Sequence, residues 1–451
     1  MTTEIESKVM EAKKAAIKLS SVKTDIKDKA LEAMAQALDT HRKEIIEANA
    51  ADLKEAEKFK QEGKLSQALV DRLKVNDNKI DGMISGIRDV IKLEDPVGKT
   101  LAALELDEGL DLYQISCPIG LIGVVFESRP DVVPQVMALC LKSGNATVFK
   151  GGSEALNSNR AIFSVLVNAI ENIDQVPEGA FHLMETREEV MDILKLDSYI
   201  DLLIPRGSNE FVKFIQDNTK IPVLGHADGI CHVYVDEKAD LETAYEVCFD
   251  SKVQYPAVCN AMETLLINRS IAEEFLPEMI RRYSEAGVEL RFDEQSYAIA
   301  EQSKPLKAIF KASEEDWKTE YNDLILSVKI VDSMDEAMEH INTYGSHHTD
   351  AIITQDSENR DRFISLVDSS SVMVNASTRF ADGFRYGKGA EVGISTNKIH
   401  ARGPVGMEGL LIYKYVLLGN GDKVADYAGT DAKPFTHKKL EKGLEEALDV
   451  E

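Results

Sequence analysis

The strongest constraint on the fold is an alternation of strand-like and helix-like segments that starts near residue 120. Apolar runs rich in β-branched residues recur there, separated by segments with apolar residues three and four positions apart. The runs of the first series are LYQISCPIGLIGVVFE at 112–127, ATVFK at 146–150, AFHLM at 180–184, YIDLLIP at 199–205 and IPVLG at 221–225. Because parallel strands need crossover helices, this rhythm predicts a doubly wound α/β fold with helices on both faces of a parallel sheet.

A second series begins with CHVYVD at 231–236 and METLLI at 262–267 and predicts a second α/β domain. A chain of 451 residues also exceeds the size of one core, so two or three domains are expected. Residues 1 to about 95 are predicted to form helices. Their apolar faces contain Ala16, Ile17, Ala30, Leu31, Met34 and Leu38. Near the C-terminus, GLLIYKYVLLG at 409–419 is a further β segment, and the charged tail after it is expected to fray.

The balance of charge limits the partners of the chain. A formal net charge of −26 makes nucleic acid and anionic membrane surfaces poor partners, because both require a cationic face. No run approaches the roughly 18 apolar residues of a membrane span, and the N-terminus lacks the apolar core of a signal peptide, so a cytoplasmic protein is expected. An anionic small molecule can still bind through clustered Arg, Lys and backbone N–H groups.

The cysteines, histidines and glycines do not form the usual disulfide, zinc-binding or nucleotide-binding motifs. The five cysteines are Cys117, Cys140, Cys231, Cys248 and Cys259, an odd number without a CxxC pair, which argues for reduced thiols. SHHTD at 346–350 lacks the spacing of a zinc motif, and no metal site is predicted. The GxGxxG and P-loop fingerprints are absent, so a dinucleotide, which a doubly wound sheet favours, must be held differently.

Three segments carry a resemblance to a known family. They are FESRPD at 126–131, QYPAVCNAMETLL at 254–266 and TRFADGFRYGKGAEVGISTNKIHARGPVGMEGL at 378–410. Nearly the whole chain closely resembles the gamma-glutamyl phosphate reductases (glutamate-5-semialdehyde dehydrogenases) of the aldehyde dehydrogenase superfamily. The resemblance implies two doubly wound α/β domains and a β-hairpin oligomerisation arm. The implied parts are a dinucleotide-binding domain at 1–100 and 118–226, a catalytic domain at 227–400, and the arm with the C-terminal tail at 101–117 and 401–451.

The activity that the resemblance implies is the NADPH-dependent reduction of L-glutamate 5-phosphate to L-glutamate 5-semialdehyde with release of phosphate. This reaction is the second step of proline biosynthesis from glutamate. The implied partners are the small substrate, further copies of the chain in a homo-oligomer, and the glutamate 5-kinase that makes the acyl phosphate.

Cys259 is the predicted nucleophile. An acyl phosphate is already activated, so its reduction needs a soft nucleophile that displaces phosphate and leaves a thioester that hydride can reduce. A thiolate meets that demand, and a cationic or N–H-rich setting increases the ionised fraction. Composition alone favours a buried core cysteine. The position in a loop and the resemblance favour catalysis for Cys259, whereas the other four cysteines are expected to be buried.

The oxyanion of the thioester needs hydrogen-bond donors. The backbone N–H of Cys259 is one expected donor. The resemblance places Arg129 where aldehyde-oxidising relatives have an asparagine, and a guanidinium there can grip a phosphate or carboxylate, so Arg129 is assigned to catalysis and to substrate binding. The alternative for Arg129 is a structural ion pair with Glu127 or Asp131.

The segment VLGHADG at 223–229 departs from hydrolytic aldehyde dehydrogenases, which carry a water-activating glutamate in the equivalent stretch. Without that base the thioester should survive until hydride transfer or phosphorolysis. His226 can act as a base in principle. A surface or hydrogen-bonded role for this histidine is the alternative.

The cofactor residues are assigned by resemblance, with NADPH/NADP as the ligand. Lys150 ends a strand and would reach the adenosine ribose or its phosphate, unless it is merely solvated. Ser153 stands where NAD-preferring relatives carry an acid on the ribose 2′-OH, which favours a 2′-phosphate. Gly207 and Ser208 open a helix and would hold the pyrophosphate, or Ser208 is an ordinary N-cap. Glu320 aligns with the glutamate that holds the nicotinamide ribose, although it is one acid among many.

The remaining substrate contacts are assigned from polarity and position. The residues chosen for the phosphate and amino-carboxylate ends of the substrate are Asn375, Thr378, Arg379 and Ser395. The glycines of YGKGAEVG at 386–393 form either a substrate loop or a plain loop.

Two rival functions remain open from the sequence. The first is an aldehyde dehydrogenase that irreversibly oxidises an amino aldehyde to the acid, and dependence on phosphate would separate it from the reductase. The second is a non-catalytic scaffold for the kinase, which loss of turnover in a folded Cys259→Ala variant would exclude.

Overall fold

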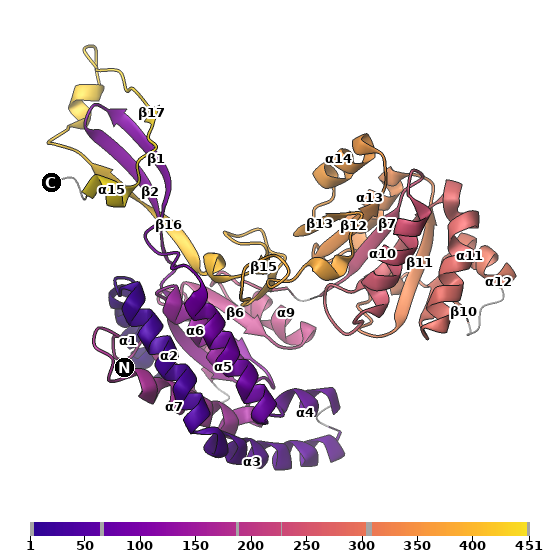
Figure 1. The fold of residues 1–451 in the computed structure, drawn as a ribbon, viewed down its shortest axis with the longest axis horizontal. Coiled ribbons are helices and arrows are strands. Elements are labelled where there is room, and N and C mark those ends of the chain that lie inside the picture. The colour runs from indigo at the N-terminus through magenta and orange to yellow at the C-terminus, as the bar shows by residue number, and fades with distance from the viewer. Residues whose placement is uncertain (1–3, 64–66, 186–188, 227, 304–308, 449–451) are drawn as a thin grey trace. The chain divides into compact units, whose positions relative to one another are not determined.

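The computed structural model describes residues 4–63, 67–185, 189–226, 228–303 and 309–448. The chain divides into two compact units, each with its own parallel sheet (Figure 1). The first unit comprises Met1–Ser208, Phe214–Leu224 and Gly406–Glu451, and the second comprises Asn209–Lys213 and Gly225–Val405. The α/β fold predicted from the two series of alternating segments is confirmed.

The sheet of the first unit is parallel, with the strand order β5-β4-β3-β6. The bounds are Leu121–Phe126 for β3, Ala146–Gly151 for β4, Phe181–Met184 for β5 and Leu202–Arg206 for β6. All residues of β3 and β4 are buried, as expected for strands covered on both faces. The predicted strand at 221–225 is wrong. That segment makes one isolated bridge, between Val223 and Leu203, because Pro222 cannot donate to a ladder.

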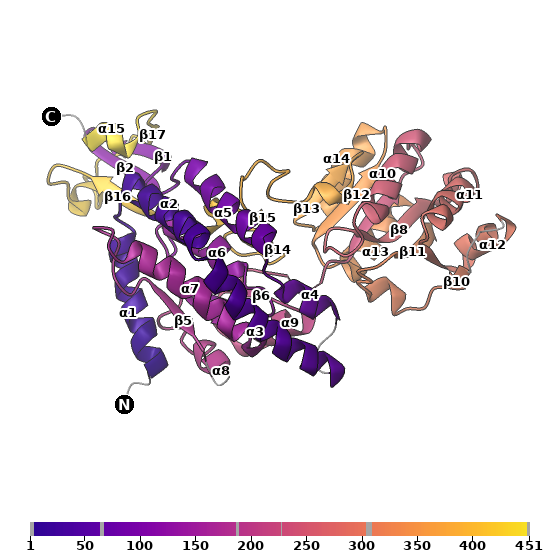
Figure 2. The ribbon, with the colours of Figure 1, turned by 60° about the horizontal axis from the view of Figure 1, so that its bottom comes forward.

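Helices cover this sheet in two layers on one side. Right-handed crossovers place α6 and α7 on one face and α8 on the other. An outer layer of α2, α3 and α5 packs on α6 and α7 (Figure 2), and α1 contacts β3, β4, β5 and α8. The bounds are Glu4–Leu19 for α1, Thr24–Thr40 for α2, Arg42–Gln61 for α3, Gln67–Leu73 for α4, Asp77–Lys92 for α5, Val132–Lys142 for α6, Ser153–Ala155 for the 3-10 turn η1, Leu156–Ile170 for α7, Glu189–Ile193 for α8 and Asn209–Asn218 for α9.

The apolar faces predicted for the N-terminal helices are buried with one exception. Ile17 is 72% exposed, so its assignment to the core is wrong. The buried face of α1 contains Val9, Ala12, Ala16 and Leu19 at three- and four-residue spacings. Ile17 lies outside this face and is exposed to solvent.

The sheet of the second unit has seven parallel strands in the order β10-β9-β11-β8-β7-β12-β13. The strand bounds are Cys231–Val235 for β7, Met262–Asn268 for β8, Glu289–Phe292 for β9, Ile309–Lys311 for β10, Ile325–Val331 for β11, Thr349–Ile353 for β12 and Ser371–Val374 for β13. The helices are α10 at Leu241–Val253, α11 at Arg269–Glu285, α12 at Glu294–Gln302, α13 at Met334–Tyr344 and α14 at Ser357–Leu366. Short elements are η2 at Asp316–Lys318, η3 at Thr378–Phe380, β14 at Gly393–Ser395 and β15 at Gly403–Val405.

Two cores flank the seven-stranded sheet because successive side chains of a strand point to opposite faces. Val233 and Val235 of β7 pack in a cluster with α11 residues such as Phe275. Tyr234, between them, packs on the other face with Ile341 of α13. This period of two places a continuous apolar strand between two helical layers.

A separate antiparallel sheet in the first unit has the order β16-β2-β1-β17 (Figure 1). Its elements are β1 at Thr100–Asp107, β2 at Leu110–Pro118, η4 at Met407–Leu410, β16 at Leu411–Leu418, η5 at Val424–Tyr427, β17 at Lys438–Lys439 and α15 at Leu444–Leu448. We call this sheet with α15 the arm. The expectation that the tail frays is wrong within the described residues: β17 pairs with β1, and Leu444 is buried against Tyr113 and Ile115, since the tail carries apolar residues at helical spacing.

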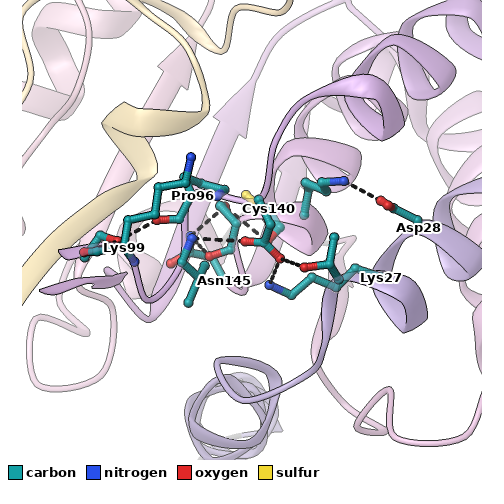
Figure 3. A network of polar contacts seen from close by, with 12 residues as sticks. Lys27, Asp28, Pro96, Lys99, Cys140 and Asn145 are labelled. Carbon is teal, nitrogen blue, oxygen red and sulfur yellow. Dashed lines mark hydrogen bonds and ion pairs between the residues drawn. The ribbon is translucent and has the colours of Figure 1, made fainter. Parts of the chain in front are cut away.

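A polar network anchors the arm strands to the helices of the first unit (Figure 3). Asn145 accepts a hydrogen bond from Gly120 N–H at 2.8 Å and donates one to Leu410 O at 2.9 Å. The buried ammonium of Lys27 pairs at 2.8 Å with Asp95, in the segment that leads from α5 to β1. These contacts fix the points where the chain enters and leaves the arm.

No helix among the described residues is long and apolar enough to cross a membrane.

Candidate active site

Cys259 lies in a loop, residues 254–261, that joins α10 to β8 in the second unit. Lys252, at the end of α10, and Glu263, in β8, form a buried ion pair of 2.6 Å that clamps the two ends of this loop. Burial raises the pKa of Glu263 to about 7 and lowers the pKa of Lys252, and each charge opposes the shift of the other. Asn260 donates to Ala381 O at 2.8 Å and fixes the loop from the side.

Gly229 allows a second backbone segment to approach the nucleophile. A Cβ built at this position would lie 2.3 Å from the carbonyl oxygen of Cys259 and 2.5 Å from its Cα. A side chain there would displace the cysteine loop, so glycine is required by the close approach.

Two histidines lie beside Cys259. One ligand atom each of His226, Cys259 and His348 lie within 4.8 Å of one another. The imidazole rings of His226 and His348 meet edge to face at 4.9 Å, and His226 Nδ1 is 2.9 Å from Ile394 O. The alternative for His226, a surface or hydrogen-bonded residue, is confirmed in its hydrogen-bonded form, since the ring is half-buried and contacts Ile394 O. Burial, and the neighbouring His226, hold the pKa of His348 well below its usual range.

Arg379 supplies a cation at the cysteine loop. The residue is 7% exposed, and its guanidinium donates from Nε to Gln254 at 3.0 Å and lies 6.0 Å from the ring centre of Tyr255. Burial lowers the pKa of Arg379, the repulsion of Arg385 adds to this, and the charge of Cys259 opposes it. The contacts with Gln254 and Tyr255 place Arg379 at the cysteine loop, so the cation favours the thiolate.

The other cysteines are free thiols, as Cys259 is. Cys140, Cys231 and Cys248 are buried, and burial raises the pKa of each. Cys231 also donates its S–H to Cys259 O at 3.2 Å and so supports the loop. The predicted burial of Cys117 is wrong: it is half-buried, because it lies in the arm, where one face of the sheet is open to solvent.

Glu320 belongs to a polar group in the second unit. Its carboxylate accepts a hydrogen bond from Asn209 at 2.6 Å, and Asn209 also donates to Asp228 at 3.0 Å. Burial raises the pKa of Glu320, Asp228 raises it further, and the N–H of Gly229 opposes the rise. Because Gly229 contacts Cys259, this chain of contacts connects Glu320 to the cysteine loop.

Lys150 and Ser153 lie at the carboxyl end of β4 in the first unit. The solvated alternative for Lys150 is wrong, since the residue is 4% exposed and its ammonium donates to Gly151 O at 2.7 Å. Ser153 is exposed and begins η1. A buried cation beside an exposed serine suits a ligand with a negative charge near that serine.

Ser208 immediately precedes α9, and its N–H and hydroxyl donate to Glu127 at 3.0 and 3.2 Å. The neighbouring Gly207 is exposed. The amide that the sequence assigns to a pyrophosphate therefore holds a carboxylate, which demonstrates that this helix start accepts an anion.

Arg129 does not form the ion pair that was its alternative role. Glu127 accepts from Ser208, and Asp131 pairs with Lys79 at 3.1 Å. Within the described residues the guanidinium of Arg129 has no ion-pair partner, so its charge is available to a ligand.

The residues assigned to the substrate differ in whether their side chains form hydrogen bonds within the protein. Asn375 bonds the backbone of Thr354 with both ends of its amide, at 2.9 Å each, which is a structural role that the sequence did not indicate. Thr378 and Ser395 are fully buried, and the side-chain oxygens of both lack a hydrogen-bond partner in the described part of the chain.

In the second unit the fold brings Cys259, Arg379 and His226 together and connects Glu320 to them. Three features of the site were not predicted from the sequence: His348, the ion pair of Lys252 with Glu263, and Asn209. The adjacent histidines at 347 and 348 were the one available signal for His348. Nothing in the local sequence distinguished the others.

The chain is similar to known proteins over its whole length. The family model described as "Aldehyde dehydrogenase family" matches residues 1–304. Gamma-glutamyl phosphate reductase of Methanococcoides burtonii is 77% identical over 449 residues, covering 100% of both chains, and that of Methanosarcina barkeri is 72% identical, covering 99% of this chain and all of the relative. The crystal structure of the Thermotoga maritima enzyme of the same name is 42% identical, with a TM-score of 0.88 over 93% of this chain and 100% of that one. The chain belongs to the gamma-glutamyl phosphate reductases of the aldehyde dehydrogenase family.

Proposed function

We propose that the protein reduces L-glutamate 5-phosphate to L-glutamate 5-semialdehyde and phosphate with NADPH, through a thioester on Cys259, as the second step of proline biosynthesis from glutamate. The observation that carries this proposal is the half-buried Cys259 beside the cation of Arg379, in a family whose named members act on gamma-glutamyl phosphate. Together they supply a nucleophile suited to the acyl phosphate that those names specify.

In the first step the Cys259 thiolate attacks the acyl carbon, the carbon–oxygen bond to phosphate breaks, and phosphate leaves with the bonding electrons. Arg379 favours the thiolate beforehand. The backbone N–H of Cys259 and the guanidinium of Arg129 are assigned to the oxyanion and to the charged groups of the substrate. Asn375, Thr378 and Ser395 complete the substrate assignment, and the buried hydroxyls of Thr378 and Ser395 support it because they have donors to offer.

When bound, NADPH would supply the hydride that reduces the Cys259 thioester. The thiohemiacetal anion on Cys259 would then re-form a carbonyl as its carbon–sulfur bond breaks, which releases the aldehyde and returns the Cys259 thiolate. The 223–229 segment carries no glutamate in place of the water-activating one, and its single acid, Asp228, accepts a hydrogen bond from Asn209 at 3.0 Å. The ring of His226 donates to Ile394 O and packs on His348, which supports a positioning role over activation of water.

The cofactor is assigned to Lys150, Ser153, Gly207, Ser208 and Glu320. Two observations support the assignment: the buried ammonium of Lys150 beside exposed Ser153, and the helix start at Ser208, where a carboxylate is already bound. The absence of an acidic residue at position 153 leaves room for a 2′-phosphate, so NADPH is the proposed form.

The arm is proposed to bind a second copy of the chain. Four residues of β16 carry large apolar side chains that are about half exposed in the single chain, namely Ile412, Tyr413, Tyr415 and Leu417. Exposed apolar side chains grouped on one strand in this way, although Lys414 lies among them, are typical of an interaction surface.

The test is the reverse reaction, measured as NADP reduction with glutamate 5-semialdehyde. The proposal predicts that the rate depends on added phosphate, because phosphate is the acyl acceptor, and that a folded Cys259→Ala variant is inactive. Equal rates with and without phosphate would favour a hydrolytic aldehyde dehydrogenase. Turnover retained by the variant would exclude the thioester.

A further inference from the structure

We propose that His226, Cys259 and His348 form a binding site for a soft divalent cation such as Zn²⁺, and that a cation bound there withdraws Cys259 from chemistry. The site would be inhibitory. Its binding part is independent of the proposed function, and only its inhibitory effect rests on that function.

The three donors come from separate parts of the sequence that the fold of the second unit brings together. His226 precedes β7, Cys259 lies before β8, and His348 immediately precedes β12. Their ligand atoms lie within 4.8 Å of one another. Donors on one tetrahedral zinc are about 3.5 Å apart, so closure requires a shift of about 1 Å, which side-chain rotation supplies.

A second observation points to a ligand at this cluster. His348 is 0% exposed, and its Nε2 is buried without a hydrogen-bond partner in the described part of the chain. The other ring nitrogen, Nδ1, lies 2.8 Å from the hydroxyl of Thr349, which fixes the ring. A buried ring nitrogen without a partner is costly unless a ligand satisfies it at some stage.

His226 forms the hydrogen bond to a backbone carbonyl that metal-bound histidines usually form. Its Nδ1 lies 2.9 Å from the carbonyl oxygen of Ile394, and because a carbonyl can only accept, Nδ1 carries the proton and Nε2 keeps its lone pair. The carbonyl also holds the ring in one orientation.

The donor set determines the class of cation. One thiolate and two imidazoles suit Zn²⁺ and similar soft ions, and they do not suit Mg²⁺ or Ca²⁺, which prefer oxygen ligands. Three protein ligands leave the fourth tetrahedral position to water or to an anion. On binding, the sulfur–hydrogen bond of Cys259 is replaced by a sulfur–metal bond, and the proton passes to solvent without any redox change.

The experiment measures binding of ZnCl2 to the chelator-treated full-length protein by calorimetry, and binding of Co²⁺ by absorption. The wild-type protein is expected to bind one cation per chain, with a thiolate-to-cobalt charge-transfer band. Cys259→Ala should abolish the band, and His226→Gln and His348→Gln should each weaken zinc binding by at least about tenfold. His347→Asn is the matched control, because His347 is the adjacent histidine and its Nδ1 contacts Asp368 O instead; it should bind zinc as the wild type does.

Two results would overturn the site: no binding of one cation per chain by the wild type, or a charge-transfer band that survives in Cys259→Ala. If His348→Gln fails to fold by circular dichroism, His226→Gln and Cys259→Ala still decide the question. Binding without reductase activity would overturn the proposed function and leave the metal site standing. Reductase activity that zinc inhibits, and that chelator restores, supports both.

Discussion

The cysteine loop of the second unit and the strand ends of the first differ in what the protein's own groups do there. Around Cys259 the chain supplies a cation, two imidazoles and a clamped backbone, so the nucleophile is prepared before any ligand arrives. At the start of α9 the chain places its own carboxylate, that of Glu127, on the amide assigned to the cofactor. We therefore propose covalent chemistry for the first region, and for the second an anionic ligand that displaces the carboxylate of Glu127.

Removal of the nucleophile should have the largest effect. Cys259→Ala is expected to lower turnover by at least about a thousandfold, because the thioester cannot form, while the unfolding temperature stays near that of the wild type. Steady-state assay of phosphate-dependent NADP reduction checks the rate. Cys117→Ala, in the half-buried arm position, is the control and should keep full activity; equal losses in the two variants would contradict a special role for Cys259.

The clamp of the cysteine loop should show the next largest effect, on stability. Glu263→Gln leaves the ammonium of Lys252 buried without its counter-charge and should cost about 3–5 kcal/mol of unfolding free energy, measured by denaturant titration. The double variant Lys252→Met with Glu263→Met removes both charges and should recover most of that loss. A single variant as stable as the wild type would show that the pair does not hold the loop.

The third prediction concerns the effect of the Arg379 cation on the reactivity of Cys259. Arg379→Gln should raise the apparent pKa of Cys259 and lower the alkylation rate at neutral pH by about tenfold, because the thiolate loses a neighbouring charge. The pH profile of iodoacetamide labelling measures this shift. Arg379→Lys keeps the charge but loses the hydrogen bond to Gln254, so it should fall between the two; a profile unchanged in Arg379→Gln would remove Arg379 from the account.

The smallest effect is expected at the helix start. Glu127→Gln keeps an acceptor for the Ser208 amide but removes the negative charge, so NADP should bind about two- to fivefold more tightly. Glu171→Gln, on an exposed helix end, changes the net charge equally and should leave the affinity unchanged. Weaker binding in Glu127→Gln would mean that Glu127 positions the cofactor and does not compete with it.

The two regions also differ in how far the sequence predicted them. Local patterns were sufficient for the parallel sheets, because apolar periodicity depends on near neighbours. The role of Cys259 rests on the resemblance and stays a prediction. The segment at 221–225 was predicted as a strand from its apolar residues alone. That prediction did not take into account that Pro222 has no N–H to donate. Burial was wrongly predicted for Ile17 and Cys117, because it depends on which face of the helix or strand is exposed to solvent.

The contacts around Cys259 depend on tertiary structure in the same way. His348 reaches the cysteine loop only because β12 lies beside β7 in the sheet, and β7 beside β8. The pairing of Lys252 with Glu263 likewise depends on how the loop turns between them. No spacing in the sequence encodes those neighbours, so they became visible only in the folded chain.

The central claim is that Cys259 carries an acyl group that water does not remove. The direct measurement is rapid mixing of the enzyme with glutamate 5-semialdehyde and NADP in the absence of phosphate, followed by mass analysis of the Cys259 peptide. The account predicts a burst of about one NADPH per chain and a glutamyl adduct on Cys259 that added phosphate discharges. Steady NADPH formation without phosphate, with no adduct on that peptide, would contradict it.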